Sequence, residues 1–422
     1  MERSPGTSAP ALQAGSPAGG MARAFLRWLW RAMDEPPVAV ALASGEHLAG
    51  PPAPEAVGRL RLRDGAVLRR LLAHPELRFG DLYSEGALAV EGDLPAVLEA
   101  LYRGIEALER SHGWVRRLAY ALTRPHGSGL RQARDNIHRH YDLGNAFYRL
   151  WLDEQLLYTC AYYPTPEATL EEAQVAKMDH VCRKLHLRPG ERVVEAGCGW
   201  GALALHMARR YGVRVRAYNI SREQLAWARE RARREGLEGR VEFVDGDWRE
   251  IDGRYDAFVS VGMLEHVGRE RYGELARLLD RCLEPHGRGL IHSIGRNAYE
   301  PFNAWIERRI FPGAYPPTLA EMVGILEPHR FSVLDVENLR LHYERTLAHW
   351  LERFERAAAR VEAMFDARFV RAWRLYLAGS MVAFRTGSLQ LFQVLFARPR
   401  LNRIPWTRAH LYVPSGAGGD EA

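Results

Sequence analysis

Two short stretches of the 422-residue chain carry a carboxylate and an imidazole in positions suited to acid–base chemistry. Residues 261–268 contain Glu265, and residues 292–295 begin with His292. Each stretch follows an apolar run that is typical of a buried strand, so both side chains are expected at strand ends. Such a pair can take part in general acid–base catalysis. A strand-end histidine is often only a hydrogen-bonded core residue, but a carboxylate at a neighbouring strand end favours a functional interpretation.

A glycine-rich turn follows an apolar run at residues 193–196. Gly197, Gly199 and Gly201 stand at alternate positions. Glycine has no Cβ and adopts positive φ, so the backbone of such a turn can lie close to a ligand. The spacing differs from the dinucleotide fingerprint, whose third glycine comes three residues after its second. The turn predicts a nucleotide-type site, with a glycine-rich turn that binds nothing as the alternative.

Polar and aromatic residues follow the next two expected strands. Asn219 and Gln224 can hydrogen-bond a ribose, and Ser221 is a good helix N-cap. Trp248 offers a flat ring face, with core packing as the alternative. Residues 140–163 are dense in aromatic side chains, whose faces stabilise cations such as a sulfonium. An ordinary aromatic core would have a similar composition.

The elements that must position these residues alternate between strand and helix. We expect strands at 193–196, 213–218, 241–245, 255–261, 288–293, 331–336 and 389–396, and helices at 202–210, 221–235 and 270–283. Right-handed crossovers turn this succession into a mostly parallel sheet with helices on both faces. Ligands bind beyond the carboxyl ends of such strands. The strongly helical residues 344–386 are long enough to form a lid or a substrate wall.

The remaining regions predict a small N-terminal α+β domain and two tails. The expected divisions are a disordered tail at 1–20, the small domain at 21–122, a basic linker at 123–139, the catalytic domain at 140–400 and a C-terminal tail at 401–422. Within the small domain we expect strands at 60–63 and 67–72, a turn-rich passage at 79–86 and a helix at 98–108. Residues 21–33 form an amphipathic helix that either lies on a bilayer or packs on its own domain. Met21 is an alternative start to Met1.

The composition restricts the class of protein. The net charge is +6, and only Lys177 and Lys184 are lysines, so almost all positive charge is arginine. This balance allows a nucleic acid or an anionic membrane surface as partner. The four cysteines form no CxxC pair and no Cys/His cluster has zinc spacing, so we expect reduced thiols in a cytoplasmic protein and no metal. No apolar stretch reaches membrane-spanning length.

These motifs together resemble the cyclopropane-fatty-acyl-phospholipid synthases and the related mycolic acid methyltransferases. The resemblance covers about residues 135–400 and includes the run 140–163, the glycine turn, 261–268, 292–295 and 343–347. It implies a class I S-adenosylmethionine-dependent methyltransferase, and the N-terminal region is similar to that of the branch acting on phospholipids. The residues it implies for S-adenosylmethionine are Tyr158, Thr159, Gly197, Gly199, Asn219, Ile220, Gln224 and Trp248. The family often has Ser in place of Thr159 and Thr in place of Asn219.

The resemblance also implies the reaction. Family members bind bicarbonate, and the matching positions are Cys160, Glu265, His292, the backbone of Ile294, and Tyr343. The implied enzyme transfers a methylene to cis double bonds in membrane phospholipids, with bicarbonate as base, at the inner face of the membrane. It implies no nucleic acid partner, and a homodimer is an open alternative. The other functions considered are methyl branching of acyl chains, methylation of a small amine, and a binding protein with an inactive methyltransferase fold. The head group and double-bond position are not fixed by the sequence.

Overall fold

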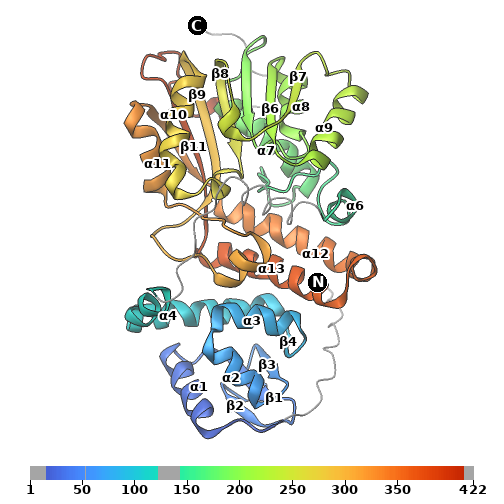
Figure 1. Ribbon diagram of the computed structural model, residues 1–422, viewed down its shortest axis with the longest axis vertical. Helices are drawn as coiled ribbons and strands as arrows, with labels where there is room; N and C mark the ends of the chain where they lie inside the picture. The colour runs from blue at the N-terminus through green and yellow to red at the C-terminus, as the bar shows by residue number, and fades with distance from the viewer. Residues whose placement is uncertain (1–15, 53, 122–142, 413–422) are drawn as a thin grey trace. The chain divides into compact units, whose positions relative to one another are not determined.

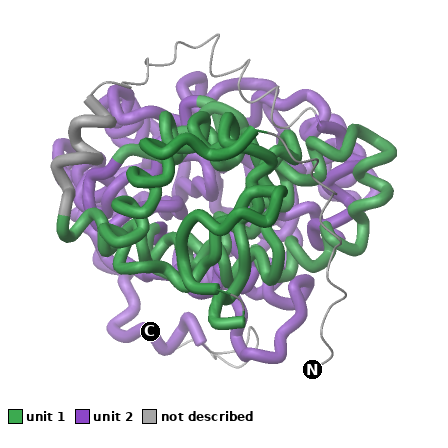
Figure 2. Tube along the Cα trace, turned by 90° about the horizontal axis from the view of Figure 1, so that it is seen from below, with its two compact units in different colours: residues 1–126, 301–312, 347–388 green, residues 127–300, 313–346, 389–422 purple. Residues whose placement is uncertain are grey.

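The computed structural model describes residues 16–52, 54–121 and 143–412. The chain forms two compact units, coloured separately in Figure 2. One unit contains residues 1–126, 301–312 and 347–388, and the other contains residues 127–300, 313–346 and 389–422. The first unit therefore includes two segments, 301–312 and 347–388, that lie within the predicted catalytic domain 140–400. The expected linker 123–139, most of the N-terminal tail and the end of the C-terminal tail lie outside the described residues.

The second unit is built on a seven-stranded sheet with the order β10-β11-β9-β8-β5-β6-β7 (Figure 1). The strands are β5 (Arg192–Ala196), β6 (Arg214–Asn219), β7 (Val241–Asp245), β8 (Tyr255–Val261), β9 (Leu283–Gly295), β10 (Ser332–Asn338) and β11 (Gln390–Ala397). The pairs among β7, β6, β5, β8 and β9 are parallel, whereas β11 runs antiparallel to both β9 and β10. The predicted mostly parallel sheet is confirmed. Several strand ends lie one or two residues from their predicted positions.

Helices cover both faces of this sheet, as predicted. Two apolar cores form, one with α7 (Leu170–Lys184), α8 (Ala202–Tyr211) and α9 (Arg222–Arg234), the other with α10 (Tyr272–Cys282) and α11 (Leu319–Leu326). The sequence sets several of these helix starts. Thr169 and Glu172 form a reciprocal capping box at α7, and the Ser221 hydroxyl accepts from the Gln224 N–H at α9. The expected cap at Ser221 is confirmed.

The first unit contains a four-stranded sheet with the order β2-β1-β3-β4. Its elements are α1 (Gly20–Ala32), β1 (Val38–Leu42), β2 (His47–Ala49), β3 (Gly58–Leu62), α2 (Gly65–Ala73), α3 (Pro75–Ser84), β4 (Leu88–Gly92) and α4 (Leu94–Ala121). The expected strand at 67–72 is wrong, because Asp64 caps a helix there by accepting from the Ala66 and Val67 N–H groups. The expected turn-rich passage at 79–86 is also wrong, because α3 continues through most of it.

The helices α12 (Arg340–Met364) and α13 (Ala367–Thr386) form the predicted helical stretch. From Leu347 onward this stretch packs with the N-terminal residues of the first unit. The contacts are specific, since the Arg371 guanidinium donates to the Ser84 carbonyl at 2.9 Å. In the same unit, Arg309 forms an ion pair with the buried Asp81 at 3.0 Å. Within the described part of the chain, no helix combines the length and apolar character needed to cross a bilayer.

Candidate active site

The glycine turn after β5 has the backbone conformation that its composition predicts. The φ angles of Gly197, Gly199 and Gly201 are 84°, 53° and 79°. The positions differ in their surroundings. A Cβ on Gly201 would lie 2.6 Å from the Phe243 ring, whereas a Cβ on Gly199 would meet no atom within 4 Å. Gly201 is therefore required for packing, and Gly199 leaves an open backbone face where a ligand can approach.

Asn219, at the end of β6, ties this turn to helix α9. Its Nδ2 donates to the Gly199 carbonyl at 3.2 Å and to Gln224 Oε1 at 2.8 Å, and its Oδ1 accepts from the Ile220 N–H at 2.9 Å. The structure therefore brings together four of the residues implied for the cofactor. Both amide hydrogens of Asn219 bond within the protein. Asn219 can therefore support ligand binding by holding the glycine turn and Gln224 in place.

Trp248 begins the 3₁₀ helix η1 (Trp248–Glu250) and is 8% exposed. It packs in the core on the α10 face of the sheet, with Tyr218 among its neighbours in that cluster. The Arg249 guanidinium lies 5.5 Å from its ring centroid. The structure thus gives Trp248 the core position that was the alternative to a ligand contact, and its cofactor role stays a prediction.

The segment before α7 places Tyr158, Thr159 and Cys160 beside an aromatic cluster. The ring of Tyr158 lies 5.6 Å from that of Tyr148 and 5.2 Å from that of Trp151. Cys160 is fully buried, its Sγ lies 3.1 Å from the Ala161 carbonyl, and burial raises the pKa of its thiol far above the ordinary value. The sulfur therefore stays protonated, as expected of a packing neighbour rather than a nucleophile.

Helix α12 begins beside this segment. The Ala161 N–H donates to Thr346 Oγ1 at 3.0 Å, and the Tyr163 N–H donates to His342 Nδ1 at 2.9 Å. These two bonds connect the first turns of α12, which carry the half-buried Tyr343, to the chain next to Cys160. Two of the positions implied for bicarbonate are thereby brought together from distant parts of the sequence.

Glu265 and His292 meet at the ends of β8 and β9, as their spacing predicts. Glu265 Oε1 accepts from the Ile294 N–H at 2.8 Å, and Ile294 lies two residues after His292 on β9. Glu265 is 7% exposed and His292 is 2% exposed. Burial raises the pKa of Glu265 to about 7 and lowers the pKa of His292 to about 3. His292 is therefore neutral at physiological pH, and Glu265 is close to half ionised.

One polar atom of each side chain has no partner among the described residues. These atoms are Glu265 Oε2 and His292 Nε2, both buried. Gln393, on β11, contacts the other ring nitrogen of His292, with its Nε2 3.0 Å from Nδ1. If Nδ1 accepts this bond, the neutral ring carries its hydrogen on Nε2. The free groups are then one hydrogen-bond donor, His292 Nε2–H, and one acceptor, Glu265 Oε2. A small oxyanion with one hydroxyl needs this pair, because its charged oxygen accepts and its hydroxyl donates.

The two parts of the site adjoin through the loop after β8. A Cβ on Gly262 would lie 3.1 Å from Thr159 Cγ2, and a Cβ on Gly197 would lie 3.2 Å from Met263 Cβ. The loop that leads to Glu265 therefore contacts both the glycine turn and Thr159. The residues present fit S-adenosylmethionine through the open face of Gly199, and they fit bicarbonate through the unpartnered atoms of Glu265 and His292.

Three buried residues of this region were not among the predicted site residues. They are Lys177 and Gln174 on α7, and Gln393 on β11. Lys177 Nζ donates to Thr159 Oγ1 at 2.7 Å, and Gln174 Nε2 donates to the Thr159 carbonyl at 2.9 Å. The rarity of lysine in the chain was the available signal for Lys177. Nothing local to either glutamine distinguishes it.

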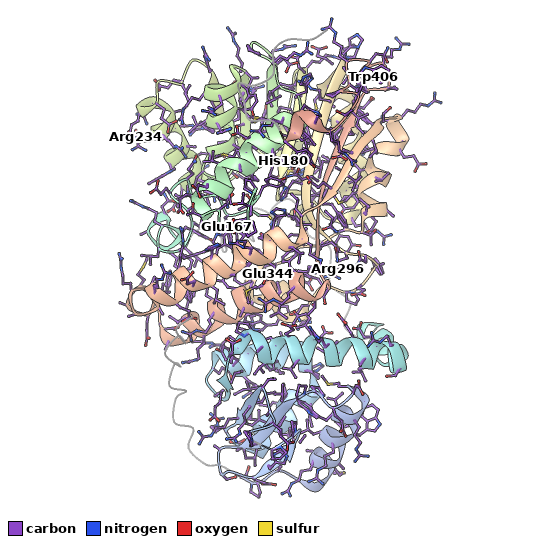
Figure 3. All side chains as sticks on the ribbon, turned by 180° about the vertical axis from the view of Figure 1, so that it is seen from behind. Glu167, His180, Arg234, Arg296, Glu344 and Trp406 are labelled. Carbon is purple, nitrogen blue, oxygen red and sulfur yellow. The ribbon has the colours of Figure 1, made fainter. Side chains whose placement is uncertain are left out.

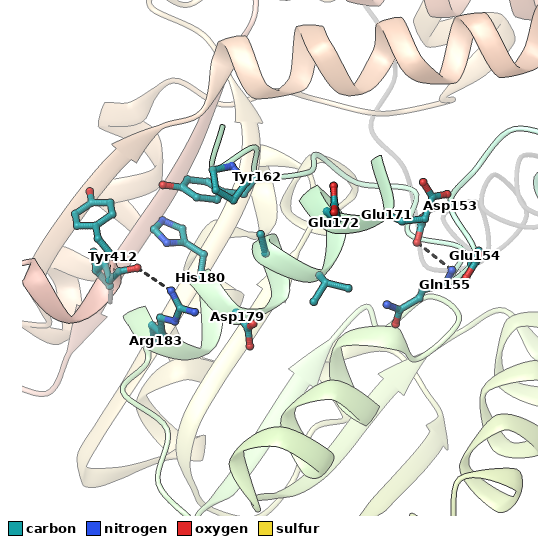
Figure 4. A pocket seen from close by; sticks show the side chains of 14 residues that line it. Asp153, Glu154, Gln155, Tyr162, Glu171, Glu172, Asp179, His180, Arg183 and Tyr412 are labelled. Atoms are coloured by element: carbon teal, nitrogen blue, oxygen red, sulfur yellow. Dashed lines mark hydrogen bonds between the residues drawn. The ribbon is translucent and has the colours of Figure 1, made fainter. Parts of the chain in front are cut away.

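A groove of about 760 Å³ lies on the outer side of α7 (Figure 4). Its lining comes from the loop before α7, from α7 itself and from the 3₁₀ helix η6 (Ala409–Leu411), and it includes Tyr162, His180 and Tyr412. His180 is also labelled in Figure 3 and stacks on the Tyr162 ring at 4.2 Å. None of the residues implied for the cofactor or for bicarbonate lines this groove, so it is separate from the site described above.

The doubly covered sheet and the glycine turn at its carboxyl edge define a class I S-adenosylmethionine-dependent methyltransferase. The chain belongs to the family described as mycolic acid cyclopropane synthetase, which matches residues 129–394. It is 36% identical over 363 residues to a probable fatty acid methyltransferase of Pseudomonas putida, covering 81% of this chain and 88% of the relative. It is 40% identical over 260 residues to the cyclopropane-fatty-acyl-phospholipid synthase of Escherichia coli K12, covering 61% of this chain and 66% of the relative.

A solved structure supports the same assignment. The mycolic acid cyclopropane synthase CmaA1, complexed with SAH and CTAB, superposes with a TM-score of 0.60 at 29% identity. The match covers 65% of this chain and 99% of the solved chain. The predicted family, fold class and S-adenosylmethionine dependence are therefore confirmed.

Proposed function

We propose that this enzyme converts cis double bonds in the acyl chains of membrane phospholipids into cyclopropane rings, with bicarbonate as the base. The observation that carries the proposal is the buried pair of unpartnered atoms, Glu265 Oε2 and His292 Nε2. Methyl transfer to an alkene leaves a carbocation that must lose a proton, and two free polar atoms in a buried place can hold the base that accepts it. Ring closure requires a base there, because a proton must leave the newly added methyl.

The chain's own residues explain how such a base is held. S-adenosylmethionine supplies the electrophilic methyl and bicarbonate supplies proton-accepting oxygen when they are bound. His292 Nε2–H donates to an anionic oxygen, and the ionised Glu265 carboxylate accepts from a hydroxyl. The low pKa of His292 keeps the ring from competing for the proton. The burial of Cys160 keeps its thiol from competing for the methyl.

Burial also protects the intermediate on the acyl chain. Methyl transfer to an alkene breaks the sulfur–methyl bond and leaves a carbocation on the neighbouring carbon of the acyl chain. Water would trap this cation, and the packed rings of Tyr148, Trp151 and Tyr158 provide apolar surface next to Thr159. Loss of one proton from the added methyl then closes the ring, so the product differs from the substrate by one CH₂.

The anion-binding role is tested with Glu265→Gln and His292→Ala. Both variants are expected to lose turnover by about a hundredfold or more, because a general acid–base group contributes on that order. Both should keep their affinity for S-adenosylhomocysteine within about twofold, since neither residue is assigned to the cofactor. His329→Ala, in an ion pair with Asp280 at 3.2 Å, is the control and should turn over normally. Near-normal rates in either site variant would overturn the assigned roles.

A second candidate is methyl branching of the acyl chain without ring closure. It is favoured by the relative from Pseudomonas putida, which is named a probable fatty acid methyltransferase and matches most of the chain. Lipids extracted after expression in a host that lacks cyclopropane lipids distinguish the two products. A cyclopropane product gains one CH₂ and no longer takes up bromine as an alkene. A methyl-branched product gains CH₂ with a double bond retained, or CH₂ and two further hydrogens after reduction.

A lipid surface as the partner is supported by helix α1, whose exposed side combines Met21, Phe25 and Trp28 with arginines. We propose that the enzyme works at the cytoplasmic face of the membrane, where unsaturated phospholipids are accessible. The substrate carbon lies deep in the acyl region, so the enzyme must act at the bilayer, where an amphipathic helix can bind.

A further inference from the structure

Lysine is used at only two positions in a chain with 58 basic residues, and both lysines are buried on helix α7. The exposed fractions are 1% for Lys177 and 3% for Lys184. Lys184 has ionic partners, since its Nζ lies 2.7 Å from Glu337 and 3.4 Å from Asp335. Among the described residues, Lys177 forms no such ion pair within 4 Å. The carboxyl groups of Asp153 and Glu195 act on this ammonium only from beyond ion-pair distance. A buried ammonium in such surroundings is costly, so it points to a task beyond folding.

The ammonium of Lys177 instead donates to a hydroxyl. The distance from Lys177 Nζ to Thr159 Oγ1 is 2.7 Å. One turn earlier on α7, the Gln174 amide donates to the carbonyl oxygens of Thr159 and Leu157 at 2.9 and 3.2 Å. Helix α7 thus holds both the backbone and the side chain of Thr159 in one place. Burial lowers the pKa of Lys177 to about 8, with the Asp153 carboxylate opposing that shift, so the group is still mostly cationic at neutral pH.

This bond decides which way the threonine hydroxyl can act. A hydroxyl whose oxygen accepts from an ammonium directs its own hydrogen elsewhere, and it then serves as a donor. A donor backed by a buried positive charge selects an anionic acceptor, because the charge strengthens the bond in a low-dielectric setting. S-adenosylmethionine has one anionic group, its carboxylate. Its sulfonium and amino group are both cationic and would be repelled by Lys177.

We propose that Lys177 is a positioning residue that orients the Thr159 hydroxyl as a donor and supplies the positive charge that holds the carboxylate of the methionine moiety. This proposal rests on the proposed use of S-adenosylmethionine and on the expectation, implied by the family resemblance, that Thr159 contacts this cofactor. It does not depend on ring closure or on bicarbonate. It also gives a reason for lysine in an arginine-rich chain. The compact ammonium of lysine can bond to a single hydroxyl, whereas the planar guanidinium of arginine presents several donors that would all need acceptors.

The test compares two ligands that differ in the amino-acid part. S-adenosylhomocysteine carries the carboxylate, and 5′-methylthioadenosine lacks both the carboxylate and the amino group. Lys177→Met keeps most of the side-chain volume and removes the charge. Its affinity for S-adenosylhomocysteine, measured by calorimetry, should fall by about tenfold to a hundredfold, the usual range for a hydrogen bond to a charged group. Its affinity for 5′-methylthioadenosine should stay within about twofold.

Two further variants keep the result interpretable. Thr159→Val should show the same selective loss, and the double variant should lose no more than about the larger single loss, because the two residues act as one unit. Lys184→Met is the matched control. It removes the other buried lysine of α7 and should lower the melting temperature while leaving the affinity ratio of the two ligands unchanged. If Lys177→Met does not fold, Thr159→Val alone carries the comparison.

Two outcomes would overturn the proposal. One is an equal loss of affinity for both ligands in Lys177→Met and Thr159→Val, which would show a merely structural role. The other is no loss for either ligand. A methyl-branched lipid product would overturn cyclopropane formation and leave this proposal standing, so the failures of the two proposals can be distinguished.

Discussion

Two glutamates in the same unit, the partly buried Glu337 and the buried Glu265, show how the surroundings of a carboxyl set its chemistry. Glu337 accepts from His180 Nε2 at 2.7 Å and pairs with Lys184, and these partners lower its pKa to about 2. Glu265 has no cationic partner among the described residues and accepts from a backbone N–H, and burial raises its pKa to about 7. The first carboxyl is committed to holding α7 against β10. The second can change its proton occupancy near neutral pH, as a group that orients an exchangeable oxyanion should.

The raised pKa of Glu265 predicts a pH-dependent stability difference between the wild type and Glu265→Gln. Because the pKa is 4.5 ordinarily and about 7 in the fold, the stability contributed by the protonated carboxyl is complete below pH 4.5 and is lost as the pH rises to 7. The glutamine variant does not titrate. The difference in free energy of unfolding between Glu265→Gln and the wild type should therefore rise in favour of the variant by up to about 3 kcal/mol across this window. Above pH 7 this difference should level off.

Urea denaturation of both proteins at pH 4.5, 6 and 8 measures this difference. Comparing the two proteins at each pH cancels the other buried groups, among them Glu195, whose pKa burial raises to about 8. A difference that does not change with pH would show that the pKa of Glu265 is the same in the folded and unfolded states, contrary to the effect expected of its burial.

The sequence predicts the strand-end positions of Glu265 and His292 but not the residues that hold the candidate site in place. Glu265 and His292 are visible because each directly follows a short apolar run, and the carboxyl ends of parallel strands meet at one edge. Lys177 and Gln393 act through contacts to residues 18 and 101 positions away. Their contacts arise only when α7 and β11 pack against the site, so apart from the rarity of lysine the sequence gives no signal for them.

At the scale of elements, the strand–turn–helix from β5 to α8 assigns different tasks to glycines that look alike in the sequence. Gly199→Ala adds a methyl to an open face in a left-handed conformation, so we expect a loss of stability of about 1 kcal/mol. The methyl would stand where a ligand approaches, so affinity for S-adenosylhomocysteine should fall more than tenfold, or about 1.4 kcal/mol.

Gly201→Ala provides the contrast. Its methyl would lie 2.6 Å from the Phe243 ring and 2.8 Å from the Ala228 Cβ, and both neighbours belong to the packed core. We expect destabilisation of about 2–4 kcal/mol, from overpacking added to backbone strain. Calorimetric melting and ligand titration of the two variants separate the effects. Equal losses of stability in both would contradict the distinction between a packing glycine and a ligand-facing one.

The elements of the second unit were easier to predict than those of the first. The βα units repeat a strong alternation of apolar runs and helical periods, and each expected strand there is present within a few residues. Residues 67–72 are apolar enough to read as a strand, but the side chain of Asp64 satisfies the first free N–H groups and starts a helix. Residues 79–86 contain Gly80, which α3 accommodates because the Trp305 ring fills the space of the missing side chain.

At the scale of the whole molecule, helix α1 has two apolar sides. Leu26 and Trp30 are buried in the first unit, and the Trp30 indole donates to the Pro36 carbonyl at 3.2 Å. Met21, Phe25 and Trp28 follow the spacing of one helix face and are 90%, 46% and 42% exposed. A helix that only packs on its own domain needs one apolar side. The second side, with the exposed Arg27 and Arg31 on the same helix, is the composition of an interfacial helix.

This arrangement predicts binding to anionic vesicles through α1. The double variant Phe25→Ser, Trp28→Ser removes a stacked pair of rings whose centroids lie 5.5 Å apart. Its partition onto phosphatidylglycerol-containing vesicles, measured by co-sedimentation, should fall by about tenfold or more, because each ring contributes apolar area to the bilayer interface. Arg27 and Arg31 add attraction to lipid phosphates, so wild-type binding should also weaken as salt is raised.

The fully exposed Trp406 supplies the control: Trp406→Ser loses an aromatic ring elsewhere and should bind vesicles normally. Since the removed rings are exposed, the melting temperature of the double variant should stay close to that of the wild type. Unchanged partition in a folded double variant would remove α1 from the membrane contact and leave the path of the lipid into the site to another surface.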